Sequence, residues 1–154
     1  MKKLLILLCF VTLQNALGNP IKGIKYSNPR LDASHMFSII TAQNKENGDE
    51  VGTILYSSKH SASPYRVIEN IAVEKGFRKQ GIGKKLMLKA LVHILTEQPE
   101  GEIRLTACPA KDSDMNLSQL VGFYKDFGFD LIAPLHENQK SACMSRSPHI
   151  FKNV

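Results

Sequence analysis

The hydrophobic pattern of the chain changes its period near residue 79, and this change limits the fold more than any other feature of the sequence. Before it, the runs 35–42, 50–57 and 65–73 are rich in β-branched and aromatic residues, which is typical of β-strands. After it, apolar residues recur at spacings of three and four, which predicts an amphipathic helix over 79–97. The sequence therefore predicts a sheet in the first half of the chain and a long helix directly after it.

The remainder of the chain repeats the same two kinds of element. A second amphipathic helix is predicted over 117–127, and Gly128 follows it where a left-handed C-terminal cap belongs. Asn, Gly and Asp within 44–49 suit a hairpin, so the sheet begins antiparallel. Further strands are predicted over 102–107, 129–133 and 142–145. This order predicts an α/β fold with a mixed, mostly antiparallel sheet flanked by helices.

The length and charge of the chain fit one ordinary globular domain. The chain has 154 residues, with 20 Lys and Arg against 14 Asp and Glu, a net charge of +6. Charged residues make up 22% and hydrophobic residues 43%, which excludes a disordered tail. The positive charge is moderate and aromatic residues do not interleave with it in any recognised motif, so no nucleic-acid partner is expected.

Residues 1–18 differ from the rest of the chain. Two lysines precede the uncharged run 4–13, and small residues up to Gly18 suit a signal peptidase. The run is shorter than the about 20 apolar residues of a membrane helix, so no stable membrane span is expected. The segment is therefore either a cleavable export signal or a hydrophobic part of the fold, and 19–154 is expected to form a single domain.

The cysteines and histidines predict no metal site. Cys108 and Cys143 lack the paired spacing of a zinc site, and the five histidines are scattered along the chain. A disulfide between the two cysteines is one alternative under oxidising conditions, but the sequence favours two free thiols buried in the core.

The most informative segment is 73–86, where a strand ends and a basic helix begins. Gly81 and Gly83 stand at the helix start, where main-chain N–H groups and the helix dipole favour an anion. A phosphate or pyrophosphate is therefore the natural ligand. A P-loop needs Gly where Arg78 stands, and a dinucleotide fingerprint starting at Gly81 needs Gly where Leu86 stands, so neither motif is present.

The remaining pattern, Arg78-x-x-Gly81-x-Gly83, resembles the pyrophosphate signature Q/R-x-x-G-x-G/A of the GCN5-related N-acetyltransferases (GNAT). The preceding run 68–73 is similar to the fourth strand of that family. Residues 123–129, Phe-Tyr-Lys-Asp-Phe-Gly-Phe, match its F-Y-x-x-x-G-F helix end. The structural alternative is a glycine-rich turn beside a helix with a core aromatic face.

The resemblance implies a cleft for acetyl-CoA between the fourth and fifth strands. In the family, the backbone of the fourth strand pairs with the pantetheine arm, and main-chain N–H groups at the helix start hold the pyrophosphate. Arg78 and Lys84 would add positive charge, although Lys84 also fits a solvated helix face. Asn116 lies one residue from the family's arm-binding Asn and either binds the arm or caps the helix. The implied cofactor-binding residues are Ile71, Ala72, Val73, Arg78, Lys79, Gln80, Gly81, Ile82, Gly83, Lys84 and Asn116.

Two residues are candidates for proton transfer while an amine attacks the thioester directly. Tyr124 matches the family tyrosine that donates a proton to the leaving thiolate, and its alternative role is core packing beside neighbouring aromatic rings. Glu69 is the candidate general base, because strand alternation places it on the same face as Ile71 and Val73, where it would act through water. Its alternative role is an exposed strand charge.

The sequence therefore predicts an N-acetyltransferase that moves an acetyl group from acetyl-CoA to a primary amine of a small molecule or protein. A catalytically weak or inactive CoA-binding domain of the same fold is the alternative. Relatives carry one or two helices between their first two strands, as a wall of the acceptor site, but few residues separate Tyr26 from His35. The acceptor site is therefore expected to be open, which suits a peptide or protein lysine, or to be completed by a second subunit in a homodimer. The N-terminus suggests secretion, whereas the need for acetyl-CoA suggests the cytoplasm.

Overall fold

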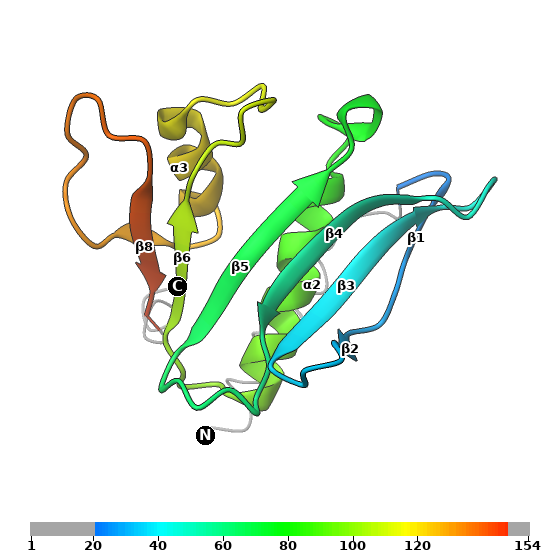
Figure 1. The fold of residues 1–154 in the computed structure, drawn as a ribbon, viewed down its shortest axis with the longest axis horizontal. Helices are drawn as coiled ribbons and strands as arrows, with labels where there is room; N and C mark the ends of the chain where they lie inside the picture. Colours follow the sequence, from blue (N-terminus) through cyan, green and yellow to red (C-terminus); the bar gives the residue numbers. More distant parts are fainter. Residues whose placement is uncertain (1–20, 148–154) are drawn as a thin grey trace, which may run out of the picture.

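The computed structural model describes residues 21–147, which form one sheet with two helices (Figure 1). The sheet order is β1-β3-β4-β5-β6-β8-β7, and β2 pairs with β3 beside β1. The predicted export signal or hydrophobic segment, residues 1–18, lies outside the described residues. The elements are β1 (Ile24–Tyr26), β2 (Arg30–Leu31), β3 (Phe37–Asn44), β4 (Glu50–Ser57), β5 (Arg66–Val73), the 3₁₀ turn η1 (Lys75–Phe77), α2 (Ile82–Glu97), β6 (Ile103–Ala107), α3 (Leu117–Lys125), β7 (Asp130–Leu131) and β8 (Ala142–Arg146).

The sheet is mixed and mostly antiparallel, as the order of elements predicts. Within the described sheet only β5 and β6 run parallel, and they pair from Arg66–Ile68 to Ile103–Leu105. A parallel pair needs a crossover connection, and α2 supplies it. The change in hydrophobic period near residue 79 therefore marks the crossover between the two central strands, β5 and β6.

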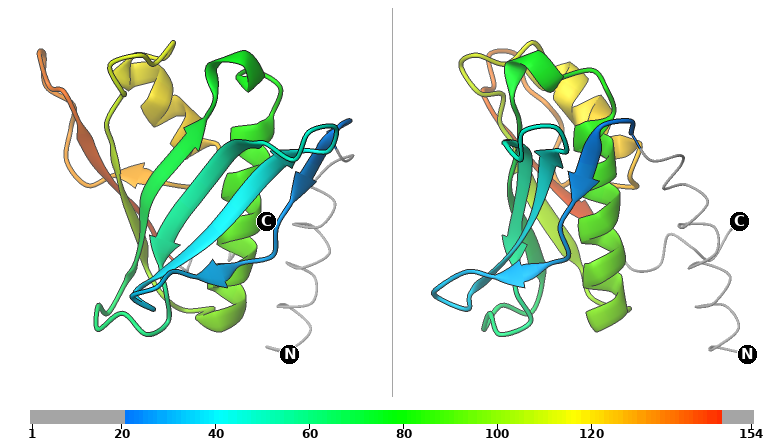
Figure 2. Two further views of the ribbon diagram at one scale, coloured as in Figure 1. Left: turned by 45° about the vertical axis from the view of Figure 1, so that its right-hand side comes forward. Right: turned by 90° about the vertical axis from the view of Figure 1, so that its right-hand side faces the viewer.

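Both helices lie on the same side of the sheet, as the right-hand view of Figure 2 shows. The hydrophobic core forms between α2 and the strands β3, β4 and β5, where Ile54, Leu86 and Ile94 are fully buried. Gly52 of β4 permits this close packing, because a Cβ there would lie 3.3 Å from side-chain atoms of Ile82 and of Leu86. Neither of the two described helices is long and apolar enough to cross a membrane.

The helix predicted over 79–97 begins later, at Ile82, because the chain first makes a left-handed turn. Lys79 has φ 61° and Gly81, the N-cap residue, has φ 83°. Glycine adopts this conformation without the steric cost that a side chain imposes, so the turn explains the glycine at position 81.

Helix α3 has well-defined signals at both ends. Asn116 accepts a hydrogen bond from the Gln119 N–H at 2.9 Å, and the Gln119 side chain accepts one from the Asn116 N–H at 2.9 Å, which is a capping box. At the other end Gly128 has φ 81°, and the N–H of Phe129 donates to the Tyr124 carbonyl oxygen at 3.3 Å. The predicted left-handed cap at Gly128 is confirmed.

Two predictions about the C-terminal half are right only in part. The strand predicted over 129–133 is limited to Asp130–Leu131, and Ile132 after it is 55% exposed. The thiols of Cys108 and Cys143 are free but exposed, not buried in the core. Cys108 lies beyond the end of β6, and Cys143 pairs with an exposed position on the β6 face opposite the core.

The base of the sheet, where β5 and β6 begin, is closed by a buried arginine. Arg66 is 5% exposed, and its guanidinium donates to the Ser57 carbonyl oxygen at 3.2 Å and to the Gln98 side-chain oxygen at 3.2 Å. A third hydrogen bond reaches the Glu97 carboxylate at 3.4 Å. These contacts join β4 and β5 to the end of α2.

Candidate functional site: the cleft between β5 and β6

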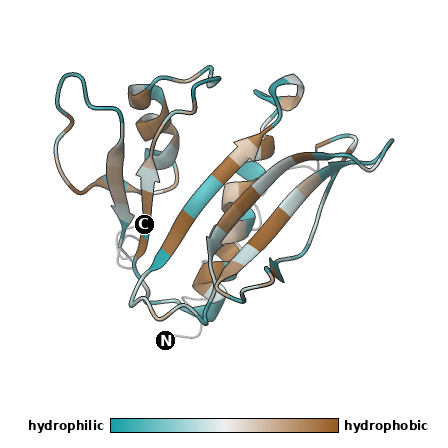
Figure 3. Cartoon of the chain, in the orientation of Figure 1, coloured by the Kyte–Doolittle hydropathy of each residue, from teal (hydrophilic) through white to brown (hydrophobic). Residues whose placement is uncertain are grey.

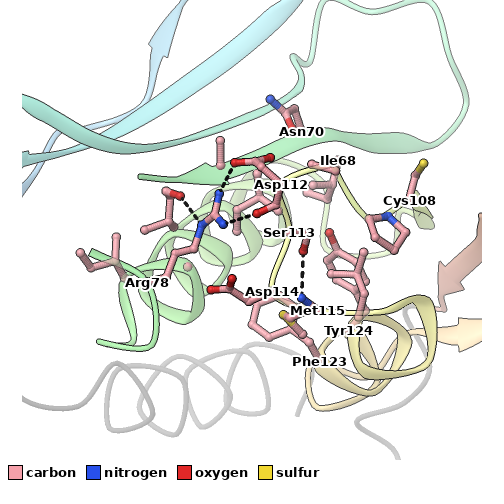
Figure 4. A pocket seen from close by; sticks show the side chains of 18 of the residues that line it. Ile68, Asn70, Arg78, Cys108, Asp112, Ser113, Asp114, Met115, Phe123 and Tyr124 are labelled. Carbon is pink, nitrogen blue, oxygen red and sulfur yellow. Dashed lines mark hydrogen bonds and ion pairs between the residues drawn. The ribbon is translucent and has the colours of Figure 1, made fainter. Parts of the chain in front are cut away.

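A pocket of about 790 Å³ opens where β5 and β6 separate. The two strands pair no further than Ile68 and Leu105, so β5 from residue 69 to residue 73 has no strand partner on its β6 side among residues 21–147. The pocket is lined by this part of β5, the start of α2, the loop after β6 and α3 (Figure 4). An extended ligand can therefore pair with the free backbone edge as an added strand would.

A β-bulge lies in β5 at the point where the strands separate. Tyr56 of β4 faces Ile68, and the next residue, Leu55, faces Asn70, so Glu69 is an extra residue in β5. A bulge bends its strand and increases the local twist, which is consistent with β5 turning away from β6 here.

The bulge overturns the alternation argument made for Glu69. Ile71 and Val73 face α2, since a Cβ on Gly83 would lie 3.6 Å from the Val73 side chain and 3.9 Å from that of Ile71. Glu69 precedes the shift in register and is exposed, so it does not continue their face as strict alternation requires. It nevertheless lines the pocket, as predicted for a group that acts there.

Tyr124 extends from α3 into the pocket (Figure 4). The residue is 6% exposed, and its ring centroid lies 5.2 Å from that of Phe123 and 6.3 Å from that of Phe129. Burial raises the pKa of Tyr124 to about 12, so the phenol is neutral at physiological pH. No group in the described part of the chain hydrogen-bonds to its hydroxyl. Tyr124 therefore packs in the core and also presents an O–H group that is available to a ligand.

The start of α2, which lines the same pocket, has the features that favour an anion. Its N-cap, Gly81, makes no side-chain capping bond, and the first turn of the helix holds no acidic residue. The N–H groups of this turn have no acceptor within the helix, and the helix dipole favours negative charge beside them. The predicted binding residues that line the pocket here are Arg78, Lys79, Gly81, Ile82 and Gly83.

Two other predicted binding residues of this turn lie outside the pocket lining. Gln80 and Lys84 are exposed and are absent from the lining. The Gln80 side chain instead donates to the Gly76 carbonyl oxygen at 3.3 Å. For Lys84 the position agrees with the solvated helix face that was its alternative role.

Arg78 does not point a free positive charge at the ligand site. Its Nε donates to the Val73 carbonyl oxygen at 3.0 Å, and its two terminal nitrogens donate to the Asp112 carbonyl oxygen at 2.7 Å and to the Asp112 carboxylate at 2.8 Å (Figure 4). The guanidinium thus joins the end of β5 to the loop after β6, across the pocket. It also holds the pKa of Asp112 below the ordinary value for a carboxyl.

Asn116 caps α3 and is not part of the pocket lining. Both its side chain and its N–H are engaged with Gln119. The structure therefore shows the capping role that was one of its two alternatives, and the arm-binding role gains no support from its position.

The sequence analysis missed several residues of the pocket wall. Asn70, Cys108, Asp112 and Asp114 all line it. The three from the loop have one sequence signal in common, since they follow directly after the strand predicted over 102–107. No cluster of three or more potential metal ligands is present in the part of the chain that the structure describes.

Comparisons with known proteins agree with this geometry. Similar solved structures include Escherichia coli ElaA, with 21% identity, a TM-score of 0.58 and coverage of 72% of this chain and 68% of that one. A GNAT family acetyltransferase from Elizabethkingia anophelis with acetyl-CoA bound shows 14% identity, a TM-score of 0.56 and coverage of 82% and 99%. Arabidopsis thaliana Naa50 in complex with the bisubstrate analogue CoA-Ac-MVNAL shows 23% identity, a TM-score of 0.51 and coverage of 71% and 72%.

These structural similarities establish the fold, and a comparison with family models adds evidence from the sequence itself. No curated protein matches the chain significantly. The model of the acetyltransferase (GNAT) family, however, matches residues 15–129, which include β5, the glycine turn and α3. The chain therefore belongs to the GNAT acetyltransferase family.

Proposed function

We propose that this protein is an N-acetyltransferase that uses acetyl-CoA and acts on a primary amine by direct attack. The observation that carries the proposal is the meeting of three features on one pocket. These are the unpaired edge of β5, the uncapped N-terminus of α2 and the accessible hydroxyl of Tyr124, whose ring is buried. Acetyl-CoA has a matching part for each: an extended arm with amide groups, a pyrophosphate and a thioester.

Acetyl-CoA fits the residues that are present. The β6 side of β5 has no strand partner at Ile71 and Ala72, so the backbone there would pair with the arm, whereas the Val73 carbonyl oxygen already accepts a hydrogen bond from Arg78. The N–H groups of Ile82 and Gly83 have no acceptor within the helix and would bind the pyrophosphate. The acetyl-CoA-bound structure of the Elizabethkingia relative supports this assignment for the same fold.

Acetyl-CoA supplies the acetyl group as a thioester, and the amine nitrogen attacks its carbonyl carbon as the C–S bond breaks. Tyr124 donates its phenolic proton to the departing sulfur. Its raised pKa of about 12 keeps the phenol protonated at physiological pH, and donation depends on the negative charge that develops on the sulfur as the C–S bond breaks. Glu69 accepts a proton from the attacking amine through a water molecule, from its exposed position on the pocket wall. The amine reacts in its neutral form, after its ammonium ion has lost one proton to solvent. After the products leave, Glu69 releases the proton that it accepted and Tyr124 regains one from solvent, so both residues return to their starting states.

The test is calorimetric titration with CoA, followed by turnover assays with lysine peptides, peptides with a free N-terminus, a polyamine and an aminoglycoside. We expect CoA to bind and at least one acceptor to be acetylated. Failure to bind CoA would overturn the proposal entirely. Binding without turnover of any acceptor would instead establish the alternative, a catalytically inactive CoA-binding domain.

A further inference from the structure

The face of β3, β4 and β5 that points away from α2 is left uncovered by residues 21–147 (Figures 1 and 2). We call it the bare face and define it by Phe37, Ile39, Leu55 and Val67. These side chains are half-buried, but they are not among the residues that pack against the core. Ile39 and Leu55 are direct neighbours across β3 and β4. The bare face is therefore an apolar surface on the opposite side of the sheet from both helices.

The face is bare because of a short connection between strands. The segment from Tyr26 to Phe37 holds only the two-residue strand β2, which lies at the sheet edge, and no helix. No helix within this segment therefore covers the face of the sheet opposite α2. Nothing else within residues 21–147 covers it, since α2 and α3 both lie on the other side.

The bare face runs directly into the wall of the pocket. Leu55 pairs with Asn70, which lines the pocket beside the bulge, and Thr53 pairs with Ala72, which also lines it. Figure 3 shows the same junction as a hydrophilic band within β5, next to the hydrophobic strands β3 and β4. A molecule that delivers a group into the pocket from this side must therefore lie on the bare face.

The charges at this junction indicate what that molecule is. Glu69 is exposed at the junction, and a primary amine approaches as an ammonium ion, so the two attract each other. Beyond the junction, Phe37, Ile39, Leu55 and Val67 are uncharged, and beside Val67 lies Arg104 of β6, which is paired with the Glu102 carboxylate. A polyamine or aminoglycoside would place its further positive charges over this apolar surface, where the adjoining Glu102 carboxylate is already paired with Arg104.

We infer that the bare face binds the acceptor as a polypeptide, with its amine at Glu69 and the adjoining apolar residues on Ile39 and Leu55. The inference rests on the proposed function. Strands lie about 4.8 Å apart, so β3 is about 10 Å from β5, a distance that three extended residues span. A second copy of this chain is a poorer occupant, because four half-buried side chains offer far less than the about 800 Å² that each partner contributes to a stable dimer.

The experiment compares two peptides that carry the same amine and differ in the three residues next to it. These three residues are Leu and Phe in the apolar peptide, and all are Ser in the serine peptide. Spermidine is the third acceptor. We expect kcat/KM to be at least about tenfold higher for the apolar peptide than for the serine peptide, in line with the loss of a pocket contact. Leu55→Lys should remove this preference and raise KM for the apolar peptide, with CoA affinity unchanged.

Two further variants make the result specific. Ile39→Ser is a milder change on the bare face and should reduce the preference by about threefold, even if Leu55→Lys fails to fold. Ile132→Lys adds the same charge at an apolar residue that is 55% exposed in the loop after β7, away from the pocket lining, and should change nothing. Fluorescence anisotropy of a labelled apolar peptide measures its affinity independently of turnover.

The outcomes separate this inference from the proposed function. If no acceptor is acetylated although CoA binds, the proposed function fails, and peptide affinity that is lost in Leu55→Lys still supports the bare face as a peptide site. Equal kcat/KM for the two peptides, a preference for spermidine, or peptide binding that both bare-face variants leave intact would overturn the inference. A dimer in sedimentation that Leu55→Lys dissociates would also overturn it, by assigning the face to a second copy.

Discussion

The two ends of β5 are each fixed by an arginine, and the surroundings of these arginines differ. Arg66, at the start of the strand, is 5% exposed and joins β4 and β5 to the end of α2. Arg78, beyond the end of the strand, has a side chain that is 23% exposed and spans the pocket to Asp112. An arginine is therefore part of the buried core at the end of β5 that pairs with β6, and it is a more exposed link across the pocket at the end where the two strands are apart. The difference separates the stability of the fold from the properties of the site.

Replacing Arg66 should have the largest effect. Arg66→Ala leaves the Glu97 carboxylate without its partner and the Ser57 carbonyl without a donor, so the free energy of unfolding should fall by about 3 kcal/mol. Urea unfolding measures this loss. Arg104→Ala is the matched control, because Arg104 lies near the same end with a side chain that is 41% exposed and pairs with Glu102. An equal loss in both variants would contradict the distinction between the buried and exposed arginines.

The next effect concerns the open end of the strand. Tyr124→Phe should lower kcat by about 10²-fold and leave CoA affinity unchanged, because only the proton donor is removed. Tyr26→Phe is the control: burial raises the pKa of Tyr26 to about 12 as well, but Tyr26 does not line the pocket. Unchanged kcat in Tyr124→Phe across the pH range would exclude the acid role.

The same two tyrosines predict how stability depends on pH. Their pKa values of about 12 in the folded state exceed the ordinary value of 10.0, so above pH 10 the unfolded chain loses protons that the folded chain keeps. Stability should therefore fall between about pH 10 and 12, and each Tyr→Phe variant should make this fall less steep. Urea midpoints measured across this range provide the measurement, and equal slopes in all three proteins would contradict it.

The glycine turn should show a smaller effect that depends on position. Gly81→Ala forces an alanine into φ +83°, which costs about 1–2 kcal/mol, and should weaken CoA binding about tenfold by displacing the helix start. Gly76→Ala is its control, since Gly76 lies outside the pocket lining and nothing lies within 4 Å of the added Cβ. Calorimetry with CoA distinguishes the two, and similar affinities for CoA would show that the turn is not needed for binding.

The smallest effect is expected for the contact between Arg78 and Asp112 across the pocket. Asp112→Asn removes a negative charge from the wall of the pocket and weakens the hold on Arg78, so CoA affinity should rise about threefold at low salt. The gain should shrink as ionic strength increases. A fall in CoA affinity would show instead that this contact pre-forms the pocket, and Arg78 would then resemble Arg66 in its role.

The sequence predicted the elements better than their pairing. The strand at 50–57 has the predicted bounds and Gly128 has the predicted cap, because periodicity and cap residues act within a few residues of each other. The bulge at Glu69 was missed, since the register of β5 depends on β4 and not on its own pattern. The Arg78 contact was missed for a similar reason, because its partner Asp112 lies 34 residues away.

The same holds for the site, where features that are local in sequence were predicted and contacts between distant residues were not. The glycine turn and Tyr124 were placed on one pocket by motifs that are local in sequence. For Asn116 the sequence left two roles open, arm binding and helix capping, and only the observed capping contacts with Gln119 distinguish them. The exposure of Cys143 depends on which face of a five-residue strand meets the core, and so short a strand carries too little pattern to decide it.

The separation of β5 from β6 has a consequence for solubility. It creates an unpaired strand edge in the middle of a sheet, and unpaired edges recruit strands from other molecules and promote aggregation. Bulges and charged side chains are the usual protection of such edges, and β5 has both where the separation begins, in the bulge at Glu69. A ligand that pairs with this edge would shield it further, so occupancy of the cleft should slow aggregation as well as enable chemistry.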